Sequence, residues 1–196
     1  MTDKAVMIPI KSFASAKIRL STVLDSNARA DLAKELATSV VSACSETPVF
    51  IACEDDAVET WARNLGAEIL RNPSEGLNEA VDFGFRSLKD RGFESVLITH
   101  GDLVYPAGLL SLFEMEEIVI VPDSELDGTN VLVLPTNIDF EFSYGPNSYK
   151  RHLKSATRLE AEVLVVADSP FSFDIDDPDD LPVSYTHLTL PTTPYV

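Results

Sequence analysis

Apolar positions in the first hundred residues form two alternating patterns. Short continuous apolar runs, typical of buried strands, occupy residues 5–10, 48–53, 67–70 and 95–102. The longer segments between them place an apolar residue at every third or fourth position, as an amphipathic helix does. We therefore expect helices over residues 27–44, 55–66 and 77–92. Asp25 is the expected N-cap of the first helix.

Strand and helix thus alternate as β-α-β-α-β-α-β, which predicts a parallel sheet with right-handed crossovers and helices on both faces. The second half of the chain is less regular. Apolar runs at 118–123, 129–135 and 162–167, with a helix over 147–160, predict antiparallel or edge strands in the same sheet. The expected fold class is α/β, a three-layer α/β/α sandwich with a mostly parallel sheet.

No linker, repeat or low-complexity segment interrupts this pattern, so residues 1–181 are predicted to form a single domain. The last stretch, LPVSYTHLTLPTTPYV, contains no Lys, Arg, Asp or Glu. A helix starting at Asp177 would also be stopped by Pro182 after one turn. We expect residues 182–196 to be a non-native tail outside the domain.

Composition limits the class of partner. The net charge of −17 argues against a nucleic-acid-binding surface, which needs a large basic face, although a small anionic ligand needs only a local cluster of cations. No apolar run approaches the roughly 20 residues of a membrane span. Cys44 and Cys53 are the only cysteines, and the sequence shows no signal peptide. We expect a cytoplasmic protein with two ordinary buried thiols.

Ligands of such sheets bind beyond the carboxyl ends of the strands. Five segments should meet there: residues 11–20, 71–78, 100–106, 122–130 and 172–181. Asp102 ends an apolar strand, and Asp174 and Asp176 alternate in FDID, so that both carboxylates point the same way in an extended chain. These three acids predict an oxygen-rich site for Mg²⁺. Alternatively, Asp102 is a turn residue and the late acids only begin a helix.

Three cations, Lys11, Lys17 and Arg19, follow the first strand. The loop contains no glycine, so it is neither a GxxxxGK[ST] nor a GxGxxG phosphate loop. Phosphate binding there would depend on side-chain charge, unless the loop is simply solvated. His100 and His152 lack the further ligands of a zinc site. We expect His100 to pack beside the acids and His152 to lie on the surface of its helix.

Two glycine turns precede later elements. DGTN (127–130) precedes a strand, and YGPNS (144–148) precedes the last helix, where Asn147 or Ser148 would be the N-cap. A helix N-terminus also attracts anions, so Ser148 could bind a phosphate or carboxylate, although capping alone is the commoner role. No Gly-x-Ser-x-Gly elbow or cysteine nucleophile indicates covalent catalysis.

Six segments, in order along the chain, resemble the phosphoenolpyruvate or 2-phospho-L-lactate guanylyltransferases of coenzyme F420 biosynthesis. They are IPIKSFASAKIRL, GLNEAV, the acid in HGDL, VPDSELDGTNVLVL, YGPNSYKRHL and FDIDDPDDL. The resemblance covers residues 6–181 and implies a nucleotidyltransferase fold of the glycosyltransferase-A type. One departure is that Val104 and Tyr105 precede Pro106, where family members usually have proline directly after Asp-Leu.

The resemblance also implies residue roles. Lys11, Lys17 and Arg19 match the loop that binds the triphosphate, and Gly76, Leu77 and Asn78 match the segment near guanine and ribose. Asp102, Asp174 and Asp176 match the metal ligands, and Thr129, Gly145 and Ser148 match contacts to the acceptor acid. Lys17, Arg19 and Asp102 would be catalytic.

The implied reaction joins GTP to phosphoenolpyruvate, giving enolpyruvyl-diphospho-5'-guanosine and pyrophosphate with Mg²⁺ as cofactor. The acceptor could instead be 2-phospho-L-lactate or 3-phosphoglycerate. A sugar-phosphate or molybdopterin nucleotidyltransferase and a nucleotide-binding protein without turnover are the other hypotheses. The resemblance further suggests a homodimer and hand-over of the product to the next transferase of the F420 pathway.

Overall fold

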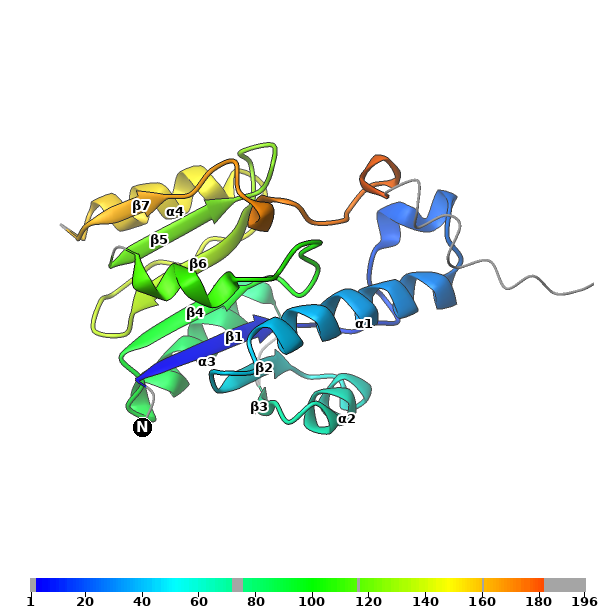
Figure 1. The fold of residues 1–196 in the computed structure, drawn as a ribbon, viewed down its shortest axis with the longest axis horizontal. Coiled ribbons are helices and arrows are strands. Elements are labelled where there is room, and N and C mark those ends of the chain that lie inside the picture. Colours follow the sequence, from blue (N-terminus) through cyan, green and yellow to red (C-terminus); the bar gives the residue numbers. More distant parts are fainter. Residues whose placement is uncertain (1–2, 72–75, 116, 160, 182–196) are drawn as a thin grey trace, which may run out of the picture.

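Seven strands form one sheet in the computed structural model, which describes residues 3–71, 76–115, 117–159 and 161–181 (Figure 1). The strands are β1 (Lys4–Pro9), β2 (Val49–Cys53), β3 (Glu68–Arg71), β4 (Ser95–Thr99), β5 (Ile118–Pro122), β6 (Thr129–Pro135) and β7 (Val163–Val165). Their order across the sheet is β3-β2-β1-β4-β6-β5-β7. β6 runs antiparallel to β4 and β5, and the other pairs are parallel. The mostly parallel sheet is therefore confirmed.

Helices cover both faces of this sheet. They are α1 (Ser26–Ala43), α2 (Asp56–Asn64), α3 (Leu77–Asp90) and α4 (Ser148–Thr157), with the short 3-10 helices η1 (Ile18–Thr22), η2 (Leu109–Glu114), η3 (Pro170–Ser172) and η4 (Pro178–Asp180). Side chains of α1, α2 and η2 pack on one face of the central strands, and side chains of α3 and α4 pack on the other. In Figure 1, the last turns of α1 lie in front of the end of the sheet while the rest of the helix extends beyond it to the right, and α4 lies behind β5 and β7. The three-layer α/β/α sandwich is confirmed.

Local sequence explains where several helices begin and end. Asp25 caps α1, because its Oδ1 accepts hydrogen bonds from the backbone N–H groups of Asn27 and Ala28, each at 2.9 Å. Gly66 and Gly92 follow α2 and α3 with φ of 80° and 88°, which a residue without Cβ adopts at no steric cost. These helix limits agree with the sequence prediction to within a few residues.

One prediction about α4 holds in position only, and a second was wrong. Asn147 is the N-cap residue, as expected, but it is left-handed, with φ of 58°, and its side chain makes no hydrogen bond to the helix backbone, while the Ser148 hydroxyl bonds Thr129. His152 was expected on the surface, but it has no exposed area. The reason is that the buried face of α4 is itself polar, with Ser148, His152 and Ser155 one turn apart, so apolar periodicity could not identify it.

The carboxyl ends of parallel β1, β2, β3 and β4 meet at one edge of the sheet, where antiparallel β6 begins. A late segment joins them there, because Leu103, after β4, forms an isolated antiparallel bridge with Asp174. Within the part of the chain that the structure describes, no helix is long and apolar enough to cross a membrane. The predicted tail, residues 182–196, lies outside the described residues.

Candidate active site

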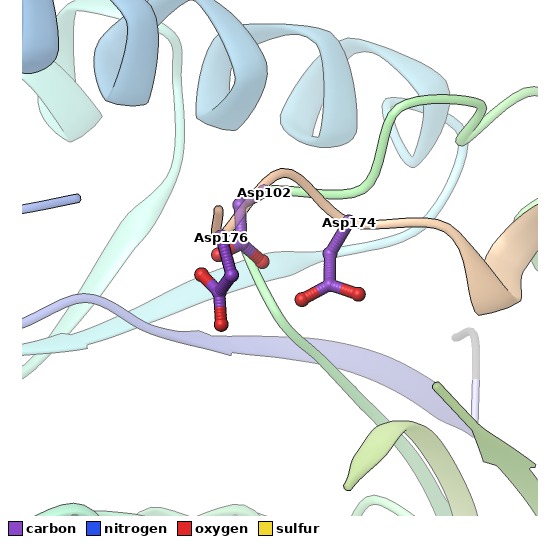
Figure 2. Close-up of side chains that lie close together, drawn as sticks. All are labelled: Asp102, Asp174 and Asp176. Atoms are coloured by element: carbon purple, nitrogen blue, oxygen red, sulfur yellow. The ribbon is translucent and has the colours of Figure 1, made fainter. Parts of the chain in front are cut away.

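Three carboxylates meet beyond the end of β4. Asp102 follows that strand, while Asp174 and Asp176 come from the segment between η3 and η4 (Figure 2). Each offers one carboxylate oxygen, and these oxygens lie within 4.8 Å of one another. The predicted grouping of Asp102, Asp174 and Asp176 is thus what the structure brings together.

Alternation along the late segment orients its two acids. Ile175, between them, is 1% exposed and packs in a small cluster with Leu20, Leu32 and Leu36 from η1 and α1. In an extended chain, burying Ile175 turns Asp174 and Asp176 to the opposite side. Asn130, the second residue of β6, further fixes Asp174 by donating from Nδ2 to its Oδ1 at 3.2 Å.

Lys17 places its ammonium group among these acids. It forms a short ion pair with Asp102 and a second one, at 3.0 Å, with Asp176. Only 6% of its side chain is exposed, and its backbone is left-handed, with φ of 54°, which is uncommon for a residue with a Cβ. Although Lys17 was expected to bind phosphate, it serves here as the counter-ion of the acids.

This environment shifts the pKa values of Asp102 and Asp174 in opposite directions. Burial alone would raise the pKa of Asp102, but Lys17 and His100, with hydrogen bonds to the carboxylate, together outweigh burial, and the pKa lies below its usual value. Asp174 pairs with no cation in the described part of the chain, and burial, with Asp102 and Asp176 nearby, raises its pKa to about 6. Burial also disfavours the charged form of Lys17, yet the two carboxylates raise its pKa above the ordinary value. Asp102 and Asp176 are therefore paired with Lys17, whereas Asp174 has no ion-pair partner among the described residues.

The donor set fits a hard divalent cation. Three carboxylates from two segments supply oxygen ligands of the kind that Mg²⁺ prefers. In addition, Oδ1 of Asp102 is buried and has no hydrogen-bond partner among the described residues. A buried carboxylate oxygen without a hydrogen-bond partner is costly unless a cation binds it. Asp102, Asp174 and Asp176 would be the ligands.

A cavity of about 300 Å³ borders this cluster. Its lining includes Lys11, Lys17, Asp102 and Asp176. Arg19 lies at the outer side, 69% exposed, with its guanidinium 3.8 Å from Asp176 and 3.7 Å from Asp177. Lys17 and Arg19 therefore lie close to the acids and Lys11 lines the same cavity as Lys17, with Lys11 and Arg19 more open to solvent than Lys17.

A second cavity, of about 220 Å³, adjoins the first and shares Pro9, Ile10 and Lys11 with it. Gly76 and Leu77 line this cavity. Asn78 does not, because its side chain holds the backbone of Tyr144: Oδ1 accepts from the N–H at 2.6 Å and Nδ2 donates to the carbonyl at 3.3 Å. The GLN segment thus divides between lining a cavity and joining α3 to the loop before α4.

Thr129 and Ser148 lie together in the interior, and their hydroxyls are 3.4 Å apart. His152 organises this pair. Its Nε2 accepts from the backbone N–H of Ser143 at 2.9 Å, so Nδ1 carries the proton and donates to Thr129 at 3.0 Å. Gly145 is nearby in the chain but exposed, with φ of 110°.

Sequence reasoning missed two residues of this region. Asn130 orients Asp174, but an asparagine at the start of an apolar run resembles an ordinary turn residue. Tyr144 packs its ring against His100 and His152, with centroids 5.7 and 4.8 Å apart. Its only sequence signal was its position beside the glycine of YGPNS, which suggested a turn. Only the tertiary fold brings these side chains to the site.

The fold is shared with nucleotidyltransferases. The chain matches, with a TM-score of 0.77 and 16% identity, a protein described as a nucleotide-diphospho-sugar transferase from Desulfovibrio desulfuricans G20, over 90% of this chain and 84% of that one. It also matches the inositol-1-phosphate CTP transferase from T. maritima, with a TM-score of 0.56 and 16% identity, over 95% and 94% of the two chains. At such identities the likeness shows the fold alone.

Sequence similarity then gives the family. Residues 4–188 match the model "Guanylyl transferase CofC like", and the chain belongs to that family. It is 36% identical to the phosphoenolpyruvate guanylyltransferase of Rubrobacter xylanophilus, over 89% of this chain and 90% of that protein. It is 27% identical to the 2-phospho-L-lactate guanylyltransferase of Methanocaldococcus jannaschii, over 93% and 82% of the two chains.

Proposed function

We propose that this protein joins GTP to phosphoenolpyruvate, giving enolpyruvyl-diphospho-5'-guanosine and pyrophosphate, as a cytoplasmic step of coenzyme F420 biosynthesis. The family and the names of its relatives support guanylyl transfer. The observation that carries the proposal is the cluster of Asp102, Asp174 and Asp176 beside a cavity that Lys11 and Lys17 also line. Such a site suits a nucleoside triphosphate with its divalent cation.

The reaction brings two anions together. An oxygen of the acceptor's phosphate attacks the α-phosphorus of GTP and forms a new P–O bond. The bond between the α-phosphorus and the oxygen that bridges it to the β-phosphate breaks, and pyrophosphate leaves with that electron pair. Mg²⁺ held by Asp102, Asp174 and Asp176 would supply the positive charge that offsets the repulsion between the substrates. A phosphate oxygen is already ionised, so no general base is needed.

The chain's own residues contribute position and charge. Lys11 and Arg19, the more open cations of the first loop, would bind the triphosphate and stabilise the leaving pyrophosphate, together with Lys17 once it is released from Asp102. We propose that Thr129, Gly145 and Ser148 bind the acceptor acid; Thr129 and Ser148 are only 1% and 2% exposed, so binding requires a rearrangement that exposes their hydroxyls. The protein takes little part in the covalent chemistry of phosphoryl-group transfer, so positioning of this kind supplies most of the rate enhancement.

The acceptor is the finer part of the proposal. Relatives with the two names differ in acceptor, and phosphoenolpyruvate is favoured because the relative at 36% identity is named for it. 2-Phospho-L-lactate and 3-phosphoglycerate are the alternates. A homodimer and direct transfer of the product to the next enzyme of the pathway belong to the same proposal.

Pyrophosphate release tests the activity. The purified protein, with Mg²⁺, is incubated with GTP or ATP and with each of the three acids in turn. We expect release with GTP and phosphoenolpyruvate and at least a hundredfold less in Asp174→Asn. Asp179→Asn, an exposed acid in η4 outside the cluster, is the matched control and should retain activity. A folded protein that binds GTP without release would instead be a nucleotide-binding protein without turnover.

A further inference from the structure

The second cavity has the character of a site for a planar, mostly apolar group. It lies beyond the ends of β1 and β2 and the start of α3, and it is lined by Pro9, Ile10, Lys11, Ala52, Cys53, Glu54, Gly76, Leu77 and Ala80. Most of these side chains are apolar or absent. A volume of about 220 Å³ accommodates a purine, which nucleotide pockets typically hold between apolar side chains with a few polar groups at the edge.

The place of this cavity beside the charged one indicates which part of a nucleotide it would take. The two cavities share Pro9, Ile10 and Lys11, so a ligand can extend from one into the other past the end of β1. The charged cavity is lined by Asp102, Asp176 and two cations, which suit the phosphates with a metal ion, and this leaves the apolar cavity for the base. This step rests on the proposed function, in which the ligand is a nucleoside triphosphate.

Among the lining residues, Glu54 alone is acidic. It directly follows β2, and its carboxylate has no ion-pair partner among the described residues, although Arg71 is close. Arg71 donates instead to the backbone carbonyl of Glu54 at 2.8 Å, and its guanidinium pairs with Asp56 at 2.6 Å and Glu59 at 2.7 Å. Arg71 thus holds the backbone beside the cavity, and none of the residues that the structure describes forms an ion pair with the Glu54 carboxylate.

We propose that Glu54 selects guanine by accepting hydrogen bonds from the N1–H and the exocyclic amine of the base. Guanine presents those two donors side by side, and a carboxylate offers two acceptor oxygens of matching geometry. Adenine presents an unprotonated N1 at the same edge, which a carboxylate repels. Selection of this kind is strong because the mismatched base leaves charged or polar groups unpaired.

A series of bases tests the proposal. Dissociation constants are measured with Mg²⁺ and without acceptor acid for GTP, ITP, which lacks the exocyclic amine, XTP, which has a carbonyl in its place, and ATP. Wild-type protein should bind GTP at least about tenfold more tightly than ITP, because a hydrogen bond to a charged group is lost. In Glu54→Ala, GTP and ITP should bind within about threefold of each other.

Glu54→Gln gives the sharper result. Its carboxamide can donate to the 2-carbonyl of xanthine, so the ratio of GTP to XTP affinity should fall at least about a hundredfold. Glu35→Gln, the same change at an exposed position of α1 outside this cavity, should leave both ratios at wild-type values. Unchanged ratios in both Glu54 variants, or a change in Glu35→Gln alone, would overturn the proposal.

The outcome is separable from that of the proposed function. If the wild type binds GTP selectively through Glu54 but releases no pyrophosphate with any acid, the reaction is wrong and the base selection stands. If it releases pyrophosphate from GTP while the Glu54 variants keep wild-type ratios, the reaction stands and Glu54 has no part in choosing the base.

Discussion

Lys17 and a divalent cation compete for two of the same carboxylates. The ammonium group pairs with Asp102 and Asp176, two of the three proposed metal ligands. We predict that Lys17→Met raises the affinity of the nucleotide-free protein for Mn²⁺ about tenfold, which corresponds to about 1.4 kcal/mol. The affinity for Mn²⁺ is measured by electron paramagnetic resonance, which detects the free ion.

Lys11→Met is the control for this effect, because it removes the same charge from the same cavity but breaks no ion pair with the acids. Its effect on Mn²⁺ affinity should be several-fold smaller. Equal effects from the two variants would mean that Lys17 acts only through its charge, without competing for the ligands.

His152 makes stability depend on pH. Burial, with Arg151 and His100 as nearby charges, lowers its pKa from 6.5 to about 4. Between pH 6.5 and pH 4, His152 therefore takes up a proton in the unfolded chain but stays neutral in the native protein. Its contribution to the free energy of unfolding is complete above pH 6.5 and declines as the pH falls toward 4. Between pH 7.5 and 5 the native state should lose about 2 kcal/mol through this residue.

Urea unfolding of wild-type protein and of His152→Gln at pH 7.5 and at pH 5 isolates the loss of stability that His152 causes. The glutamine cannot titrate, and its side-chain oxygen can still accept the hydrogen bond from Ser143 that His152 accepts. The variant should be less stable at pH 7.5 but should show a pH dependence smaller by about 2 kcal/mol. The same pH dependence in both proteins would mean that His152 does not remain neutral in the native state.

At the scale of elements, the segment between η3 and η4 depends on one buried side chain. Ile175 fixes which way Asp174 and Asp176 point by packing with Leu20, Leu32 and Leu36. Ile175→Ala should cost about 2–4 kcal/mol of unfolding free energy, and Ile175→Val about 1 kcal/mol. Because the two acids would lose their fixed orientation, Mn²⁺ affinity should fall as well.

Phe173→Ala is the comparison on the same segment. Phe173 is 46% exposed, so its removal should cost under about 1 kcal/mol and leave the acids in place. Chemical denaturation and Mn²⁺ titration of both variants measure the two effects. If Ile175→Ala left metal affinity at the wild-type value, another contact would have to orient the acids.

At the scale of the whole molecule, the site joins parts that are far apart in the chain. β4 and the late segment meet through the bridge between Leu103 and Asp174, and one sheet contains all the described strands. We predict a single cooperative unfolding transition, with the fluorescence of Trp61 on α2 coinciding with far-ultraviolet circular dichroism. Two separate transitions would mean that the protein does not unfold as a single cooperative unit.

GTP with Mg²⁺ should shift this transition as a whole. At a hundred times the dissociation constant, a ligand that binds only the native state adds about 2.7 kcal/mol. Both probes should move together, and Asp174→Asn should abolish most of the shift. A shift in only one probe would indicate that the ligand stabilises one part of the molecule.

Local chemistry in the sequence determined most of the elements. The capping carboxylate of Asp25 and the glycines after α2 and α3 act within one or two turns of chain, so their effect can be recognised without the fold. Alternation in FDID likewise predicted that Asp174 and Asp176 share a side. The general rule for strand ends then sufficed to group them with Asp102.

Tertiary structure decided what depends on contacts between distant residues. The insertion of β6 between β4 and β5, and the burial of His152 against Thr129, follow from packing that no local pattern encodes. The same is true of Lys17, whose cationic character was evident in the sequence but whose partners, 85 and 159 positions away, were not. By itself, the sequence determined the elements and the kinds of charge at the site, because these are properties of short segments. The fold alone decided which charges neutralise one another, because Coulomb interactions and burial depend on distances in space.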